Sequence, residues 1–247
     1  MFLDWTFILL IPAVILAAWA QMRVMGAYRK WSRVAASCGM TGAQVAADMM
    51  RRADLLADVE RSNPPAAIRA ANILRSVSVQ AADGQLTDHY DPASNTLNLS
   101  EGVYASNSLA ALGIAAHEAG HAIQKATAYR SLVLRTTLVP AARIGSALAW
   151  PLFLIGLYVA GSGSRLLMDI AILMYCGAVV FTLVTLPVEF DASRRALRML
   201  SAGGYVREAE MPAVRQVLGA AAMTYVAAAL MAVLTLIRLL LIRSERD

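Results

Sequence analysis

The chain has 247 residues, of which 58% are hydrophobic and 16% are charged, and its formal net charge is +5. Soluble domains usually carry about 25% charged residues, so this composition argues against a soluble protein and predicts one that crosses a membrane. The positive balance does not indicate a nucleic-acid partner, because no recognisable nucleic-acid-binding module accompanies the basic residues.

The first predicted element is a membrane-spanning helix over residues 5–22, which carry no charge. Its length is close to the roughly 20 residues that a helix needs to cross the hydrocarbon core. No Lys or Arg precedes it, whereas a signal peptide begins with positive charge. The basic residues follow it instead, so the positive-inside rule places the chain from about residue 23 in the cytoplasm. These residues are Arg23, Arg29, Lys30 and Arg33.

The next segment, 23–137, is too polar to cross lipid and is predicted to be a small α+β insert. Apolar residues at helical spacing predict helices, and alternating residues predict strands. Thr41 is a candidate N-cap for the first of the helices. The expected elements are helices at 43–57 and 68–75, strands of a small antiparallel sheet at 76–80 and 96–99, and a longer helix at 106–127.

The longer helix contains AAHEAGHAIQ, at 115–124, with two of the three histidines of the chain. His117 and His121 are four residues apart, so on a helix they share one face and can bind one metal ion. Glu118 is displaced around the helix, where it can take a proton from a water molecule without being a ligand. Gly120 is unfavourable in mid-helix, which indicates the close approach of another backbone. This H-E-x-x-H spacing is typical of zinc peptidases.

Three more apolar runs predict three further membrane-spanning helices, because only a helix satisfies its own backbone groups in lipid. A polar segment, 189–216, joins the last two runs. Two crossings separate it from the H-E-x-x-H motif, and arginines flank both, which places both in the cytoplasm. The runs are 144–164, 166–188 and 217–237.

A catalytic zinc site needs a third protein ligand, and the residues alone leave three candidates open. His89 is the only other histidine, and Glu189 and Asp191 lie in LPVEFDASRRA at 186–196. Residues two apart point roughly 200° apart on a helix, so the two carboxylates cannot both face one ion. Because proline is tolerated near a helix start, we expect a new helix to begin near Pro187 and to present Glu189. Asp191 is then expected in a solvated ion pair with the neighbouring arginines.

Five motifs, in this order, resemble those of the YugP-type bacterial membrane zinc metallopeptidases: LTDHYDP, LNLSEGVY, AAHEAGHAIQ, LPVEFDASRRAL and AAAMTYVAA. That family is similar in layout to the HtpX-type membrane proteases. The resemblance implies a neutral zinc peptidase of the bacterial inner membrane, with Zn²⁺ held by His117, His121 and Glu189 and with Glu118 as the base. In HtpX-type enzymes an aspartate four residues after the ligand glutamate supports a zinc-bound histidine; here that position is Ser193.

The sequence therefore predicts a mainly α, multi-pass membrane protein with about four transmembrane helices and a small zincin-like α+β cytoplasmic insert. Its expected parts are an anchor at 1–22, a catalytic insert at 23–137, and further spans at 138–247, where 189–216 carries the third ligand. The expected function is zinc-dependent endopeptidase cleavage of peptide or protein substrates, membrane proteins among them, at the cytoplasmic face of the bilayer.

The candidate contacts to substrate or transition state are His89, Tyr90 and Asn98, which lie before the motif. We expect a substrate chain to lie extended beside the sheet near 97–100, because strand addition is a common way to hold peptides. The alternative is a non-catalytic zinc-binding membrane adaptor or regulatory subunit, for which a closed four-ligand site is expected. Three good ligands and a catalytic-type glutamate favour the peptidase.

Overall fold

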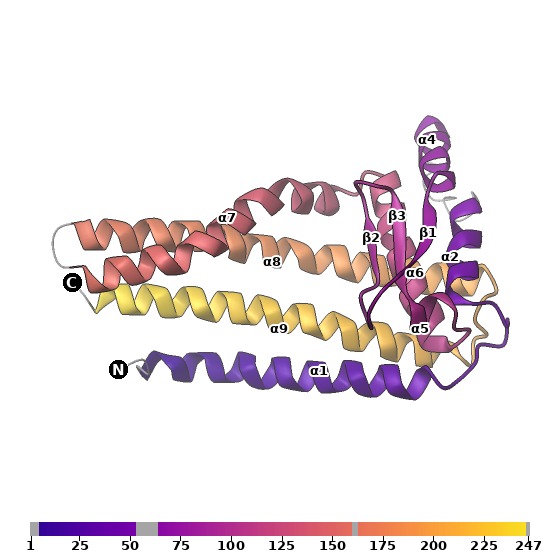
Figure 1. The fold of residues 1–247 in the computed structure, drawn as a ribbon, viewed down its shortest axis with the longest axis horizontal. Coiled ribbons are helices and arrows are strands. Elements are labelled where there is room, and N and C mark those ends of the chain that lie inside the picture. The colour runs from indigo at the N-terminus through magenta and orange to yellow at the C-terminus, as the bar shows by residue number, and fades with distance from the viewer. Residues whose placement is uncertain (1–4, 53–63, 160–162, 246–247) are drawn as a thin grey trace. The chain divides into compact units, whose positions relative to one another are not determined.

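The computed structural model describes residues 5–52, 64–159 and 163–245. It is mainly helical with one small sheet (Figure 1), which confirms the predicted fold class. The predicted helix 43–57 is observed as far as Arg51, and its last five residues lie outside the described ones. The elements are η1 (Trp5–Leu10), α1 (Ile11–Trp31), α2 (Gly42–Arg51), α4 (Pro64–Arg75), β1 (Ser78–Ala82), β2 (His89–Asp91), β3 (Thr96–Ser100), α5 (Glu101–Tyr104), α6 (Leu109–Ala126), α7 (Arg130–Tyr158), α8 (Gly163–Ala202) and α9 (Met211–Ser244).

Four helices in the described chain are long and apolar enough to cross a membrane, and each predicted run lies largely within one of them. They are Trp5–Trp31, Arg130–Tyr158, Gly163–Ala202 and Met211–Ser244.

The expected helix start at Pro187 is wrong, because α8 continues through this proline without a break. A proline inside a helix removes one backbone hydrogen bond, but neighbouring elements and local adjustments make this tolerable in apolar helices. Pro140 and Pro151 lie inside α7 in the same way. Glu189 therefore belongs to the same continuous helix as the third apolar run.

The chain divides into two compact units. The apolar unit comprises Met1–Gln21, Val133–Pro187 and Met223–Asp247, and the sheet unit comprises Met22–Leu132 and Val188–Ala222. The sheet unit thus takes in most of the polar segment that joins the last two apolar runs. Both the H-E-x-x-H motif and Glu189 belong to the sheet unit.

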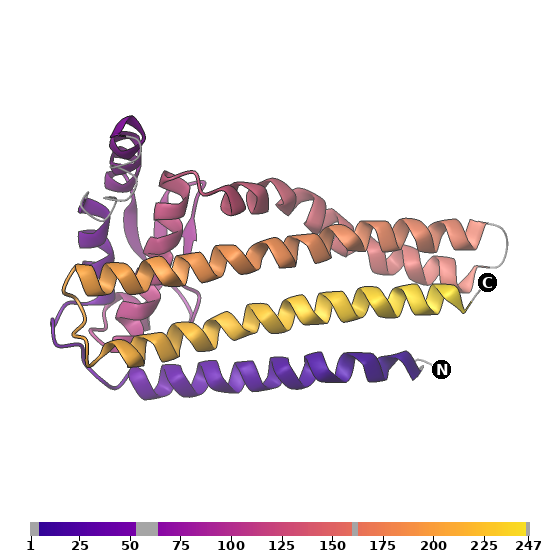
Figure 2. The ribbon, with the colours of Figure 1, turned by 180° about the vertical axis from the view of Figure 1, so that it is seen from behind.

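In the apolar unit, the beginning of η1 and the end of α9 lie side by side (Figure 2). The Trp5 indole N–H donates to Glu245 Oε1 at 2.8 Å. Arg238, only 7% exposed, donates from Nε to Thr6 Oγ1 at 3.0 Å. The two described ends of the chain are therefore at the same end of this unit.

The sheet of the sheet unit has the strand order β1-β3-β2. Strands β2 and β3 form an antiparallel hairpin, but β1 pairs with β3 in parallel. The expected all-antiparallel sheet is wrong, because the chain passes from β1 to the far side of β3 before β2 begins. β3 is paired with β1 along its whole length and with β2 over Thr96–Asn98, and the expected substrate position beside 97–100 stays a prediction. The outer edges of the sheet belong to β1 and β2.

Helix α6 lies in the core of the sheet unit. Its N-cap, Ser108, accepts a hydrogen bond from the Ala111 N–H at 3.2 Å, which satisfies one of the unpaired donors of the first turn. Residues such as Leu112 and Ala119 are fully buried in a cluster that also includes Leu97 of β3. Thr41 caps α2 with a reciprocal bond to Gln44, as expected. This packing fixes the helix that carries the motif.

Candidate metal centre

The structure brings His117, His121 and Glu189 together. Glu189 Oε2 lies 3.2 Å from His117 Nε2 and 3.5 Å from His121 Nε2. The two imidazole rings are edge to face, with centroids 4.8 Å apart. Glu189 is only 3% exposed. Among the described residues, these three form the group of His, Cys, Asp and Glu side chains whose donor atoms could hold one metal ion.

A close contact between the backbones of α6 and α8 allows these three side chains to approach one another. A Cβ atom built on Gly120 would lie 2.6 Å from the Ala192 carbonyl oxygen, nearer than real Cβ atoms come to backbone. The glycine therefore lets the two backbones approach, as its place in mid-helix predicted. Glu189, one turn before Ala192, then reaches His117, one turn before Gly120, and His121, the residue directly after it.

Gln124 fixes the tautomer of His121. Its side chain is fully buried, and its amide nitrogen donates to the Val188 carbonyl at 2.8 Å and to Asp191 Oδ2 at 2.9 Å. Both partners can only accept, so the amide oxygen must face His121 Nδ1, 3.0 Å away. Nδ1 therefore carries the proton, and Nε2 presents its lone pair towards Glu189.

Ser193 makes the matching contact to the other histidine. Its hydroxyl oxygen lies 3.1 Å from His117 Nδ1 and can accept a hydrogen bond from Nδ1–H. This is the position that an aspartate holds in the HtpX-type pattern. A hydroxyl orients the ring as a carboxylate would, but without adding a charge. Both imidazoles are thus held with Nε2 towards Glu189.

Glu118 lies beside the three candidate metal ligands, His117, His121 and Glu189, and is not one of them. Its Oε2 accepts a hydrogen bond from the Tyr90 backbone N–H at 2.9 Å, and the side chain is only 8% exposed. This N–H points away from β3, so the outer edge of β2 runs beside the glutamate. Edge strand and motif helix together hold the carboxylate in place.

The surroundings of the centre are negative. Burial raises the pKa of Asp88 and outweighs the hydrogen bonds from Ser100, while the charge of Glu118 raises it further. Burial disfavours the charged form of His121, yet in that form Nε2–H can donate to Glu189, and this bond together with the charges of both glutamates leaves the pKa of His121 raised. A cation is the species that such an arrangement stabilises.

Two comparisons decide the family. A family model described as "Putative neutral zinc metallopeptidase" matches residues 6–66 and 63–244. The chain is also 41% identical, over 234 residues, to "Putative membrane protease YugP" of Bacillus subtilis (strain 168), which covers 95% of this chain and 94% of that protein. The chain belongs to this zinc metallopeptidase family. The resemblance inferred from the five motifs is confirmed, and no solved structure matches the chain significantly.

The donor set fits the zinc of this metallopeptidase family. Two imidazole nitrogens and one carboxylate oxygen, all within 4.8 Å of one another, match the His₂Glu set of known catalytic zinc sites. Each histidine has a partner on its other ring nitrogen, as ligating histidines almost always do. His117, His121 and Glu189 are therefore the residues of this chain that would hold Zn²⁺.

The other third-ligand candidates lie in different surroundings. Asp191 accepts from Arg195 Nε at 2.6 Å, the ion pair expected from the sequence, and from Gln124 on the same oxygen. His89 lies on the exposed face of the sheet, with Nε2 3.3 Å from the Asn98 amide nitrogen. No hydrogen bond joins His89 or Asn98 to the centre in the described part of the chain.

Tyr90 contributes to the centre through its backbone. Its ring is buried in the core of the sheet unit, and its hydroxyl donates to Asn95. The predicted roles of His89, Tyr90 and Asn98 towards substrate stay predictions. The backbone N–H of Tyr90 and the amide of Gln124 are the contacts that the sequence reasoning missed. Gln124 could have been found, because it lies three residues after His121, on the same helix face.

We expect Gln124→Leu to lower the affinity for zinc about 10–100-fold, the usual effect of losing an outer partner of a ligand. Leucine fills much of the same volume but cannot accept the hydrogen bond from the Nδ1–H of His121. Competition with a chelator of known affinity measures the change, and Gln80→Leu, on the exposed face of β1, is the matched control. Equal affinities in the two variants would contradict this role of Gln124.

Proposed function

We propose that this protein is a zinc-dependent endopeptidase embedded in the bacterial inner membrane, which cleaves peptide or protein substrates at the cytoplasmic face. The observation that carries the proposal is the place of Glu118, beside the three donors and outside their group. A structural zinc site needs four protein ligands and no neighbouring base. The geometry therefore favours the peptidase over a non-catalytic adaptor or regulatory subunit.

Glu118 acts as the proton carrier in the proposed reaction. When bound, zinc supplies Lewis-acid polarisation of the scissile carbonyl and acidifies a water molecule. Glu118 takes a proton from the attacking water and delivers it to the amine nitrogen as the C–N bond breaks. The Tyr90 N–H donates to one carboxylate oxygen of Glu118, and the other oxygen accepts no hydrogen bond from the described residues. That second oxygen is the one that carries the proton.

The outer edge of β2 is the proposed place for the substrate. An extended peptide adds to a sheet only along an edge strand, and β2 is the edge strand whose backbone contacts Glu118. Because the Tyr90 N–H already donates to Glu118, a chain lying along β2 would pair with the other backbone groups of this edge and bring its carbonyl groups past the base. Both short peptides and extended loops of membrane proteins suit this arrangement.

The proposed activity is tested on the purified full-length protein with casein as the substrate. We expect cleavage to disappear when a chelator removes the metal and to return on addition of zinc, because both imidazoles and Glu189 would then regain their ion. Addition of magnesium is the control, since magnesium prefers oxygen ligands in octahedral geometry. Cleavage that is insensitive to the chelator would contradict the proposal.

The proposed sidedness predicts that a reporter fused after Lys125 is cytoplasmic and that one near Gly163 is external. The C-terminus is also expected outside, although Arg238 and Arg243 oppose this by the positive-inside rule. Arg238 is buried, and Arg243 pairs with Asp169 at 2.9 Å, so neither is a free surface charge. Alkaline phosphatase and fluorescent-protein fusions measure the sides. A cytoplasmic C-terminus would contradict the four-span topology.

A further inference from the structure

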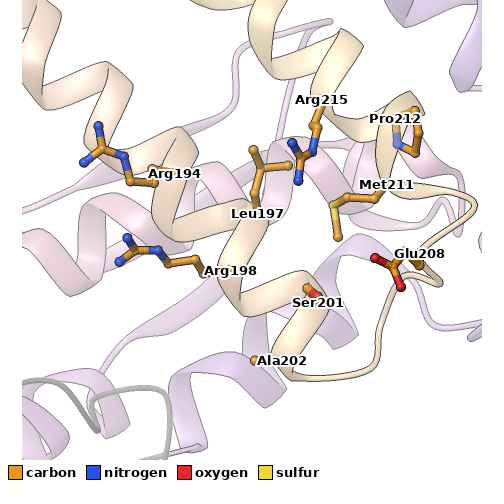
Figure 3. Close-up of a pocket in the computed structure, with 9 residues that line it drawn as sticks. All are labelled: Arg194, Leu197, Arg198, Ser201, Ala202, Glu208, Met211, Pro212 and Arg215. Carbon is orange, nitrogen blue, oxygen red and sulfur yellow. The ribbon is translucent and has the colours of Figure 1, made fainter.

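A pocket of about 780 Å³ lies between the end of α8 and the start of α9, within the sheet unit (Figure 3). Figure 3 shows Arg194 and Arg198 extending from α8 to the same side, with Arg215 of α9 near Leu197. Three arginines thus contribute to the lining of one pocket, Arg194 and Arg198 on one side of Leu197 and Arg215 on the other. The pocket is lined by Arg194, Leu197, Arg198, Ser201, Ala202, Glu208, Met211, Pro212 and Arg215.

These three arginines have no hydrogen bond or ion pair to another side chain within the part of the chain that the structure describes. Arg195, next to Arg194, does have such a partner: it pairs with Asp191 and lies over the Tyr129 ring. The donors of the pocket are therefore left available, whereas those of Arg195 are used.

Such an arrangement has a cost that a ligand would offset. Arg194 and Arg198 are one turn apart on the same helix, where like charges destabilise the helix. The single carboxylate of the pocket, Glu208, lies near Met211 and away from these two groups (Figure 3). Guanidinium groups match the oxygens of phosphate with two parallel hydrogen bonds. All three arginines are exposed, so water solvates them when the pocket is empty, and an oxyanion is the ligand that would replace this water.

Part of the remaining wall is apolar and suggests what is attached to the anion. Leu197, Met211 and Pro212 line the pocket beside the guanidinium groups. A free inorganic ion would leave this surface unused, whereas the organic part of a phosphate ester can cover it.

We propose that this pocket binds the phosphate group of a phosphate ester, which either a phospholipid headgroup or a soluble phosphate ester could supply. Arg194, Arg198 and Arg215 hold the phosphate oxygens, and Leu197 and Met211 contact the carbon skeleton. The site is distinct from the metal centre and does not depend on the proposed peptidase activity. Binding is therefore expected in the Glu118→Gln protein as in the wild type.

The test uses the full-length protein in an uncharged detergent, with dihexanoyl phosphatidylglycerol, glycerol phosphate and inorganic phosphate as probes. Binding is measured by native mass spectrometry and by the shift in melting temperature. One variant combines Arg194→Gln, Arg198→Gln and Arg215→Gln. The control combines Arg69→Gln, Arg130→Gln and Arg207→Gln, which removes the same charge from exposed positions outside the pocket.

We expect the pocket variant to bind the preferred probe at least about tenfold more weakly, since several charge-assisted hydrogen bonds are lost, and the control variant to bind like the wild type. Preference for the lipid over glycerol phosphate identifies a headgroup site, and equal binding of both identifies a soluble ester. Equal losses in the two variants, or no binding to the wild type, would overturn the proposal. If the triple variant does not fold, Arg194→Gln and Arg198→Gln are compared singly with Arg207→Gln.

Discussion

Glu118→Gln is expected to bind zinc like the wild type and to lose peptidase activity about 10²–10⁴-fold, the usual contribution of a positioned general base. The glutamine oxygen can still accept the hydrogen bond from the Tyr90 N–H, so the fold and the three ligands should be preserved. The amide cannot take the proton of the attacking water, so only the chemical step is lost. Metal analysis and casein cleavage on the same preparation measure both effects.

The control is Glu101→Gln, an exposed glutamate at the start of α5 in the same unit. It removes the same charge away from the three donors and should leave both zinc content and rate unchanged. A near wild-type rate for Glu118→Gln would remove this residue from the mechanism. A loss of zinc together with activity would instead make Glu118 a part of the binding site.

Glu189→Ala is expected to abolish stoichiometric zinc binding and, with it, activity. The carboxylate is buried between the two histidine nitrogens, and a catalytic zinc site does not keep its metal tightly with two protein ligands. Asp191→Ala should keep the metal, because this carboxylate contacts Gln124 and Arg195 and none of the three donor atoms. Zinc content per chain after dialysis distinguishes the two variants.

His117→Ala serves as the reference for complete loss of a ligand in this series. If Asp191→Ala releases the metal while Glu189→Ala retains it, the third ligand is Asp191 and the assignment of Glu189 is wrong. Such a result would also require α8 to turn by roughly half a revolution, since the two side chains point in different directions on one helix.

The residues of the motif could be predicted from the sequence because their geometry is local. The i, i+4 spacing places His117 and His121 on one face wherever the helix lies. The glycine between them indicates that another backbone packs closely against this face. The motif resemblance pointed to Glu189, and the direction of the two carboxylates followed from helix periodicity. The expected helix start at Pro187 was not needed, because α8 presents Glu189 without a break.

Strand order and backbone contacts could not be predicted from residue patterns. The alternation in β1 and β3 predicts strands, but their parallel pairing depends on the path of the chain between them. That path decides that β2 is an edge strand, and so where a substrate can lie. The hydrogen bond from Tyr90 to Glu118 comes from a peptide N–H, which no side-chain pattern marks.

The backbone bond from position 90 to Glu118 has a consequence for sequence variation. Every amino acid except proline supplies a peptide N–H, so natural variation at this position can change the side chain without releasing the glutamate. The side chain of Tyr90 serves the stability of the core, where its ring packs and its hydroxyl contacts Asn95. Stability and the placement of the base are therefore separable at this position. A change of side chain can alter the stability of the fold while Glu118 stays in place, and only a substitution that removes the N–H, as proline does, affects both.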